Sequence, residues 1–176
     1  MSYRVTITGS ESTGKTTLSE RLANHYRTIF APDYSRYYIG QLNHKYNQND
    51  LIEIARGIIE QEDKMMAEAN QVLFSDNDLL NIKIWLEYYK WEVPAWLEEQ
   101  IVNRKSDLYL LCDIDLPWIP DPQRANPHDR FELFNQFKAG LAHVKANFKL
   151  VTGTNQQVRT DKAIQHIDFL LNSHSP

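Results

Sequence analysis

The chain has 176 residues, of which 42% are hydrophobic and 24% charged, with a formal net charge of −4. This length and composition predict a single domain, residues 1–176, with a sizeable buried core. The negative charge excludes a broad nucleic-acid surface, and no apolar run approaches the ~20 residues that a membrane span needs. Cys112 is the only cysteine, and no signal-like apolar region opens the chain. We therefore expect a cytoplasmic protein with neither nucleic-acid nor membrane partners, and the oligomeric state stays open.

In chain order, the hydrophobic pattern predicts strands that alternate with helices, which is typical of a parallel sheet covered on both faces. Asp50 and Glu53 have the spacing of a capping box at the start of a long helix. The expected strands are 3–8, 28–32, 72–75, 108–112 and 148–152. The expected helices are 16–26, 34–46, 50–70, 78–91, 95–103, 131–146 and 157–172.

The junction between the first strand and the first helix fits the pattern G-x-x-x-x-G-K-[ST]. Glycines at this position let successive N–H groups point into one concavity, to which the helix adds the positive end of its dipole. The Lys15 ammonium suits the β- and γ-phosphates, and the Thr16 hydroxyl suits Mg²⁺. The motif therefore predicts a P-loop that binds ATP through Gly9, Ser10, Glu11, Ser12, Thr13, Gly14, Lys15, Thr16 and Thr17.

A metal ion held by a P-loop takes a second contact from a carboxylate at the end of a neighbouring strand. Asp76 and Asp113 both follow apolar runs that we expect to be strands. We favour Asp76 with Thr16 as the metal ligands, because Asp78 follows and paired carboxylates suit both a metal and sugar hydroxyls. The alternatives are that Asp113 completes the metal site, or that Asp76 only caps a helix.

A P-loop alone does not define a reaction. No aspartate is followed by glycine three residues later, and no N-K-x-D is present, so the pattern excludes a switch GTPase. A kinase needs cationic groups over the transferring phosphoryl. The proline-rich segment 115–130 carries Arg124, His128 and Arg130, which predicts a lid that closes over the phosphates. Ordinary surface arginines on a solvated loop are the alternative.

The sequence Ala-Pro-Asp-Tyr-Ser-Arg follows the second expected strand and places Asp33 and Arg36 at the carboxyl edge of the sheet. Ligands of such folds bind at this edge. A carboxylate there can accept a proton from a substrate hydroxyl. The alternative role of Asp33 is to cap the next helix.

Together these stretches resemble the ribosylnicotinamide kinase domain of NadR-type proteins and related NadR-like P-loop ATPases. The resemblance covers nearly the whole chain and implies a P-loop NTPase fold, an α/β three-layer sandwich with strand order 2-3-1-4-5. It implies Mg²⁺- and ATP-dependent phosphorylation of nicotinamide riboside to nicotinamide mononucleotide. It rests on "GSESTGKTTL", "APDYSR", "LFSDNDLLNIKIW", "DLYLLCDIDLPWIPDPQR" and "VTGTNQQVRTDKAIQHI".

The resemblance also implies roles for individual residues. Some members have tryptophan where this chain has Pro32, so Tyr34 or Trp118 is expected to stack on the nicotinamide ring, with Trp118 alternatively anchoring the lid. Thr154 is expected beside adenine. The implied catalytic residues are Lys15, Asp33, Arg124 and Arg130. The implied substrate-binding residues are Asp33, Tyr34, Arg36, Asp76, Asp78 and Trp118.

Two rival functions remain. One keeps the chemistry but transfers the phosphoryl group to another nucleoside. The other is an ATP-switched binding module that hydrolyses ATP slowly while it holds a partner. An acceptor pocket lined by carboxylates favours the enzyme, whereas an open apolar groove favours the module.

Overall fold

Five parallel strands form one sheet in the order β2-β3-β1-β4-β5, which confirms the predicted order. The computed structural model describes residues 2–121 and 128–173. Every residue of β3 and β4 is buried, because these strands lie inside the sheet and beneath helices on both faces. The strands are β1 (Tyr3–Thr8), β2 (Phe30–Ala31), β3 (Val72–Asp76), β4 (Leu108–Cys112) and β5 (Phe148–Val151).

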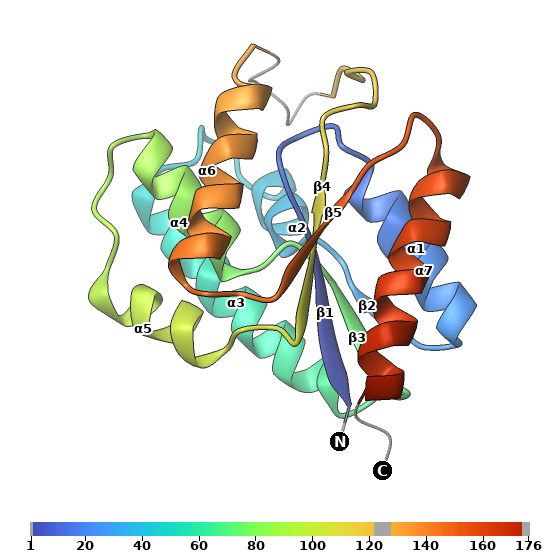
Figure 1. Cartoon of the computed structure of the whole chain (residues 1–176). Coiled ribbons are helices and arrows are strands. Elements are labelled where there is room, and N and C mark those ends of the chain that lie inside the picture. The colour runs from blue at the N-terminus through green and yellow to red at the C-terminus, as the bar shows by residue number, and fades with distance from the viewer. Residues whose placement is uncertain (1, 122–127, 174–176) are drawn as a thin grey trace.

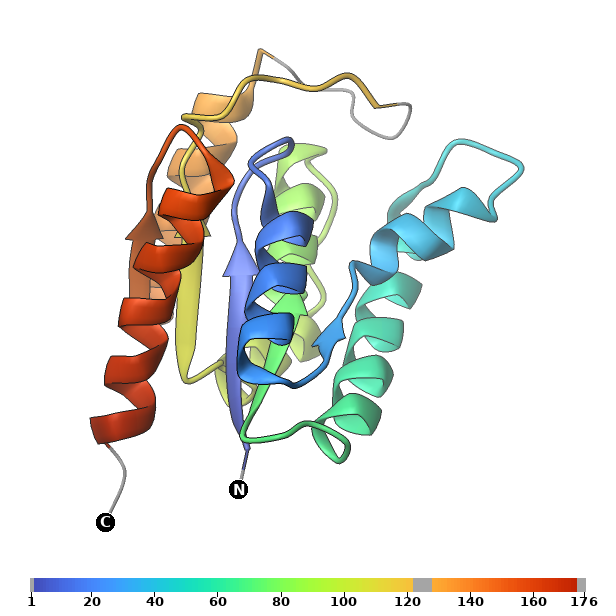
Figure 2. The same ribbon diagram turned by 90° about the vertical axis from the view of Figure 1, so that its right-hand side faces the viewer.

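Helices cover the sheet on both faces and complete the predicted three-layer sandwich (Figure 1, Figure 2). On one face lie α1 (Lys15–Tyr26) and α7 (Gln156–Ser173), which pack against each other and enclose a core with Ile7, Leu22 and Ile167. The other helices form the opposite layer around two further apolar clusters. They are α2 (Tyr34–Gly40), α3 (Gln48–Met66), α4 (Leu79–Tyr88), α5 (Ala95–Asn103) and α6 (Arg130–His143).

Several element boundaries differ from the sequence-based prediction, and three of the differences have a local cause. β2 has only two residues, because Pro32 has no N–H to continue the ladder. α2 ends at Gly40, a residue that disfavours helix continuation. α3 begins earlier, because Asn47 is its cap and the Asn47 N–H donates to Asp50 Oδ2 at 2.8 Å. The predicted capping box of Asp50 with Glu53 is therefore wrong, and Asp50 is the third residue of the real one.

The carboxyl ends of all five strands meet at one end of the molecule, because the strands are parallel. This end lies at the top in Figure 1, opposite the start of β1 and the end of α7. The loops that carry the predicted site residues are therefore gathered at one edge. Within residues 2–121 and 128–173, no helix has the length and apolar character to cross a membrane.

Candidate active site

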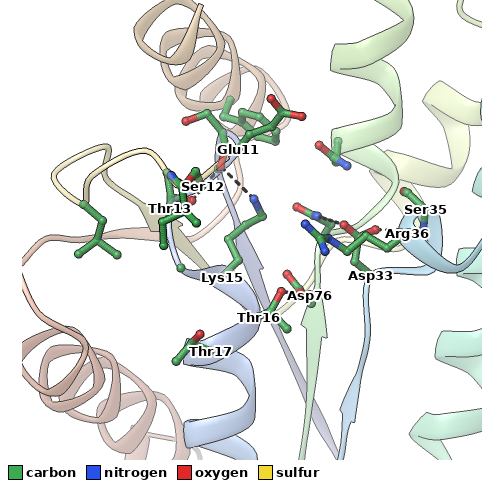
Figure 3. A pocket seen from close by; sticks show the side chains of 18 of the residues that line it. Glu11, Ser12, Thr13, Lys15, Thr16, Thr17, Asp33, Ser35, Arg36 and Asp76 are labelled. Atoms are coloured by element: carbon green, nitrogen blue, oxygen red, sulfur yellow. Dashed lines mark hydrogen bonds between the residues drawn. The ribbon is translucent and has the colours of Figure 1, made fainter. Parts of the chain in front are cut away.

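A cavity of about 470 Å³ opens at the carboxyl edge of the sheet. The P-loop, residues 9–16, lines one side, and side chains of Asp33, Ser35 and Arg36 lie across from it, with Lys15 pointing into the space between (Figure 3). The cavity therefore joins the phosphate-binding loop to the loop after β2, as the sequence predicts. Its apolar part is lined by Ile39, Tyr46, Leu51, Ile82, Trp85, Leu116, Pro117, Ile119 and Phe137.

The P-loop depends on glycine at two positions. Gly9 has φ +133°, and a Cβ there would lie 2.9 Å from the carbonyl oxygen of Cys112. Gly14 has φ +77° and precedes α1, where a Cβ would meet the side chains of Gln156 and Leu116. The Lys15 ammonium donates to the carbonyl oxygen of Ser10 at 2.9 Å, which holds its charge inside the loop. The loop thus presents main-chain N–H groups and one cation to the cavity.

Asp76 and Thr16 form the closest polar pair beneath the loop. Thr16 Oγ1 donates to Asp76 Oδ2 at 2.5 Å, whereas the Thr17 side chain points away from Asp76 but still belongs to the cavity lining (Figure 3). Asp76 is 3% exposed, and its Oδ1 has no hydrogen-bond partner among the described residues. Burial raises the pKa of the Asp76 carboxyl to about 6, the Lys15 charge opposes that rise, and Asp33 adds to it.

These two oxygen ligands fit a hard cation such as Mg²⁺. The described part of the chain holds no cluster of three or more His, Cys, Asp or Glu side chains suited to a metal, so phosphate oxygens and water would complete the shell. Asp113, the alternative ligand, does not line the cavity, and its Oδ1 accepts from the Ile114 N–H at 2.7 Å. The geometry therefore favours Asp76.

Asp33 caps α2, the alternative role that the sequence offered, and it also lies at the cavity. Its Oδ1 accepts from the Ser35 N–H at 3.0 Å, which caps α2, and its Oδ2 accepts from Asn77 Nδ2 at 3.0 Å. The carboxylate still lines the cavity. Arg36 also lines the cavity, and its guanidinium pairs with Asp121 at 2.7 Å. This ion pair joins α2 to the segment after β4.

Asp78 does not reach the cavity, and its predicted pairing with Asp76 is wrong. Its Oδ1 accepts from the Leu80 N–H at 3.2 Å and caps α4, and the Tyr109 hydroxyl also bonds to it. Burial, with the nearby Glu62 charge, raises the pKa of the Asp78 carboxyl to about 6. Asp78 instead lines a second, small pocket with Arg4, Glu62, Arg104 and Ser106.

Tyr34 does not line the cavity either, so the structure does not support its predicted role in stacking on a substrate ring. Its ring packs on Gly57 of α3 so closely that a Cβ built there would lie 2.1 Å from Tyr34 Cε1. Tyr34 is thus part of the apolar cluster between α2 and α3.

We predict that Gly57→Ala destabilises the protein by about 1–3 kcal/mol, because the added methyl must displace the Tyr34 ring from a packed core. Thermal melts check this, with Gly40→Ala on the exposed end of α2 as the control. Equal melting temperatures for Gly57→Ala and the wild type would show that Tyr34 is not held there.

The predicted lid residues divide into three cases. Arg124 lies outside the described residues. Arg130 donates to the carbonyl oxygens of Ser12 and Leu116, each at 3.1 Å, so it ties the segment after β4 to the P-loop without lining the cavity. Trp118 lies outside the cavity lining too, with the Arg130 guanidinium 5.8 Å from its ring centroid. The structure supports Trp118 as an anchor of this segment, its alternative role.

Arg159 ends the stretch 152–159 that the resemblance places beside adenine, but sequence reasoning missed that it connects the P-loop to the loop after β5. Its guanidinium is 1% exposed and donates to the carbonyl oxygens of Thr13 at 2.5 Å, Asp113 at 2.9 Å and Val151 at 3.1 Å. It also pairs with Asp115 at 3.2 Å. The loop after β5 reaches the cavity through Thr154, as predicted for an adenine contact, and through Asn155 and Gln156.

Two aromatic side chains in the cavity lining, Trp85 and Tyr46, were also missed. Tyr89 holds both of them: its ring stacks on Trp85 at 6.0 Å, and its hydroxyl bonds to that of Tyr46 at 2.8 Å. Asn81 and Trp85 lie one helical turn apart on α4 and both line the cavity. This i, i+4 spacing after the strand was a signal in the sequence.

Comparisons with known proteins identify the family and the fold of the chain. A family model described as an AAA domain, AAA_28, matches residues 4–159. The trifunctional NAD biosynthesis/regulator proteins NadR of Salmonella typhimurium and Escherichia coli are each 30% identical to the chain over 125 residues. The match covers 69% of this chain and 30% of each relative, so the chain spans about 30% of the length of these curated relatives.

Solved structures show the same fold. A NadR protein in complex with NR aligns over 97% of this chain and 50% of its own, with 24% identity and a TM-score of 0.76. A NadR structure with NAD and AMP-PNP gives 23% identity and a TM-score of 0.75 over the same shares. Thymidylate kinase from Ehrlichia chaffeensis has 12% identity and a TM-score of 0.68, over 94% of this chain and 98% of its own. The architecture is a P-loop kinase-like fold, and the resemblance to NadR-type proteins is confirmed.

Proposed function

The chain belongs to the AAA domain family AAA_28, and from this premise we propose that it is a small-molecule kinase that transfers the γ-phosphoryl of ATP to a ribosyl hydroxyl of nicotinamide riboside. The observation that carries the proposal is the single cavity in which the P-loop faces Asp33, Asp76 and an aromatic wall. A nucleotide-switched binding module has no need of an acceptor compartment next to its phosphate loop.

On the ATP side, P-loop N–H groups and Lys15 hold the phosphates, and Thr154 of the cavity lining is the proposed contact for the adenine base. Thr16 and Asp76 would hold Mg²⁺, which neutralises charge on the β- and γ-phosphates when bound. Arg124 and Arg130 remain proposed lid residues, with Arg130 acting from its contact with the Ser12 carbonyl.

On the acceptor side, Asp33 is the proposed base. Its carboxylate accepts the proton of the attacking hydroxyl as the new bond to the γ-phosphorus forms and the bond from that phosphorus to the β,γ-bridging oxygen breaks. Arg36 stands beside it on the first turn of α2. The two hydrogen bonds to Asp33 fix its carboxylate in place before the substrate arrives.

Charge and shape of the cavity favour a cationic aromatic base. The Asp33 carboxylate faces this compartment, and the charge of Arg36 is already paired with Asp121. Trp85 and Tyr46 supply the flat apolar surfaces that we first expected from Tyr34 and Trp118. A pyridinium ring over an aromatic face gains about 0.5–2 kcal/mol, which a neutral nucleobase does not share.

We predict that kcat/KM for nicotinamide riboside exceeds that for uridine, cytidine and adenosine by roughly 10-fold or more at fixed Mg·ATP, because the acidic, aromatic compartment prefers a cation. Trp85→Leu should reduce this preference about 2- to 30-fold by removing the cation–π face. Release of ADP measures both effects. The matched control is Trp96→Leu, since Trp96 of α5 lies under Arg56 and outside the cavity lining.

Each alternative outcome has a definite meaning. A neutral nucleoside that equals nicotinamide riboside would show that the acceptor is wrong while the kinase chemistry stands. No increase in ADP release with any acceptor would favour an ATP-switched binding module.

A further inference from the structure

Asn77 has an uncommon backbone conformation beside the cavity. It follows Asp76 at the end of β3 and has φ +73°, the left-handed region that few residues other than glycine adopt. Its N–H donates to the carbonyl oxygen of Ile7 at 3.0 Å, and its side chain lines the cavity while the residue is only 7% exposed. Strained, buried positions of this kind cluster at functional sites.

In the Asn77 side chain, the amide nitrogen makes a hydrogen bond and the amide oxygen makes none within the described residues. Nδ2 donates to Asp33 Oδ2 at 3.0 Å. A carboxylate only accepts hydrogen bonds, so the nitrogen has to face Asp33 and the oxygen has to face elsewhere. In the part of the chain that the structure describes, this Oδ1 is buried and has no partner. A buried acceptor without a donor is costly, and a ligand hydroxyl in the cavity would supply one.

The neutral amide also suits its charged surroundings. Asp33 and Asp76 are close enough that the Asp33 charge contributes to the raised pKa of Asp76. An aspartate at position 77 would tolerate the same backbone region, but it would add a third carboxylate and could not donate to Asp33 when ionised. Of asparagine and aspartate, which have the same shape and both suit this conformation, only asparagine gives Asp33 a donor.

We propose that Asn77 bridges Asp33 and the acceptor: its amide nitrogen positions the Asp33 carboxylate, and its amide oxygen accepts a hydrogen bond from a second hydroxyl of the acceptor sugar. This inference rests on the proposed function, in which Asp33 is the base. It assigns to Asn77 a positioning role for the reaction and a binding role for a polyhydroxylated acceptor.

The test compares Asn77→Gly, which keeps the left-handed backbone, with Asn77→Asp, which keeps the shape but loses the donor. With nicotinamide riboside, both should lower kcat on the order of 10-fold, because a misplaced base transfers the proton poorly. Asn77→Gly should also raise the KM of the acceptor, while the KM of ATP stays at the wild-type value. The control is Lys145→Gly, an exposed left-handed residue (φ +53°) far from the cavity lining, which should behave as wild type.

The Asp33→Ala variant distinguishes an error in this inference from an error in the proposed function. If Asn77 acts through Asp33, Asn77→Gly should lower kcat much less in the Asp33→Ala background than alone, yet still raise the acceptor KM. Wild-type kcat and acceptor KM in Asn77→Gly, with Asp33→Ala slow, would overturn the bridging role alone. Equal rises in the KM of ATP and of the acceptor would show a merely structural residue and overturn it too. Full turnover in Asp33→Ala would overturn the proposed base and, with it, the positioning role.

Discussion

Lys15→Ala should lower kcat by roughly 100-fold or more and leave the melting temperature unchanged. A positioned charge on the transferring group is worth about 3–4 kcal/mol of barrier, comparable to other electrostatic stabilisers. The Lys15 ammonium contacts the carbonyl oxygen of Ser10 in its own loop and makes no contact with the apolar core, so its loss leaves the packing intact.

The measurement is turnover with saturating acceptor and Mg·ATP, beside a thermal melt of each variant. Lys138→Ala, on the exposed side of α6, is the matched control and should turn over as the wild type does. A folded Lys15→Ala protein with undiminished kcat would show that the P-loop lysine does not serve the phosphates.

Asp76→Asn should also reduce turnover by roughly 100-fold and raise the Mg²⁺ concentration needed for half-maximal rate, because an amide is a poorer ligand for a hard cation. Asp78→Asn is its matched control. Asparagine caps a helix as well as aspartate does, and position 78 lies outside the cavity lining, so turnover should be retained. Similar losses of turnover in both variants would show that Asp78 also acts in the active site.

Asp76→Asn and Asp78→Asn should each make the stability of the protein depend less on pH. Each carboxyl has a pKa of about 6 in the folded protein against an ordinary value of 3.8, so the folded state binds the proton more tightly. Stability from this source is greatest below pH 4 and is lost as pH rises through 6. Removing either carboxyl should flatten that decline, as melts from pH 4 to pH 7 without nucleotide or Mg²⁺ would show. An unchanged slope would mean that the carboxyl is not buried as described.

The parts of the site that follow from local pattern were predictable. The P-loop is encoded by contiguous residues, since glycines, lysine and threonine act through the backbone that they themselves form. Strand order and layering were expected from the resemblance, and the alternation of strands and helices agrees with it. Asp33 lies at the cavity because the carboxyl ends of parallel strands meet at one edge.

The spacing of the two aspartates in the sequence did not reveal that the Asp78 side chain lies away from the cavity. Asp76 and Asp78 were predicted as a pair because two carboxylates so close in the sequence suit a metal and sugar hydroxyls. β3 ends at Asp76, and the chain turns at Asn77, which has a positive φ, so that Asp78 caps α4 and bonds to Tyr109 instead of lining the cavity. A single backbone angle separates the two carboxylates.

Long-range packing determines the positions of the other residues that the sequence analysis misplaced or missed. Tyr34 turns toward Gly57 because the missing side chain there leaves room for its ring, which no short motif reveals. Arg159 binds carbonyl oxygens of three separate segments, and carbonyls carry no sequence signature. Such contacts arise only once the strands and the P-loop are assembled.

Transfer of a labelled γ-phosphoryl group tests the central proposal most directly. The protein is incubated with Mg²⁺, nicotinamide riboside and ATP labelled at the γ-phosphate, and the products are separated and identified by mass. We predict that the label appears in nicotinamide mononucleotide and that Lys15→Ala abolishes its appearance there. Label found only in inorganic phosphate would contradict the account, because the protein would then hydrolyse ATP without phosphorylating this acceptor.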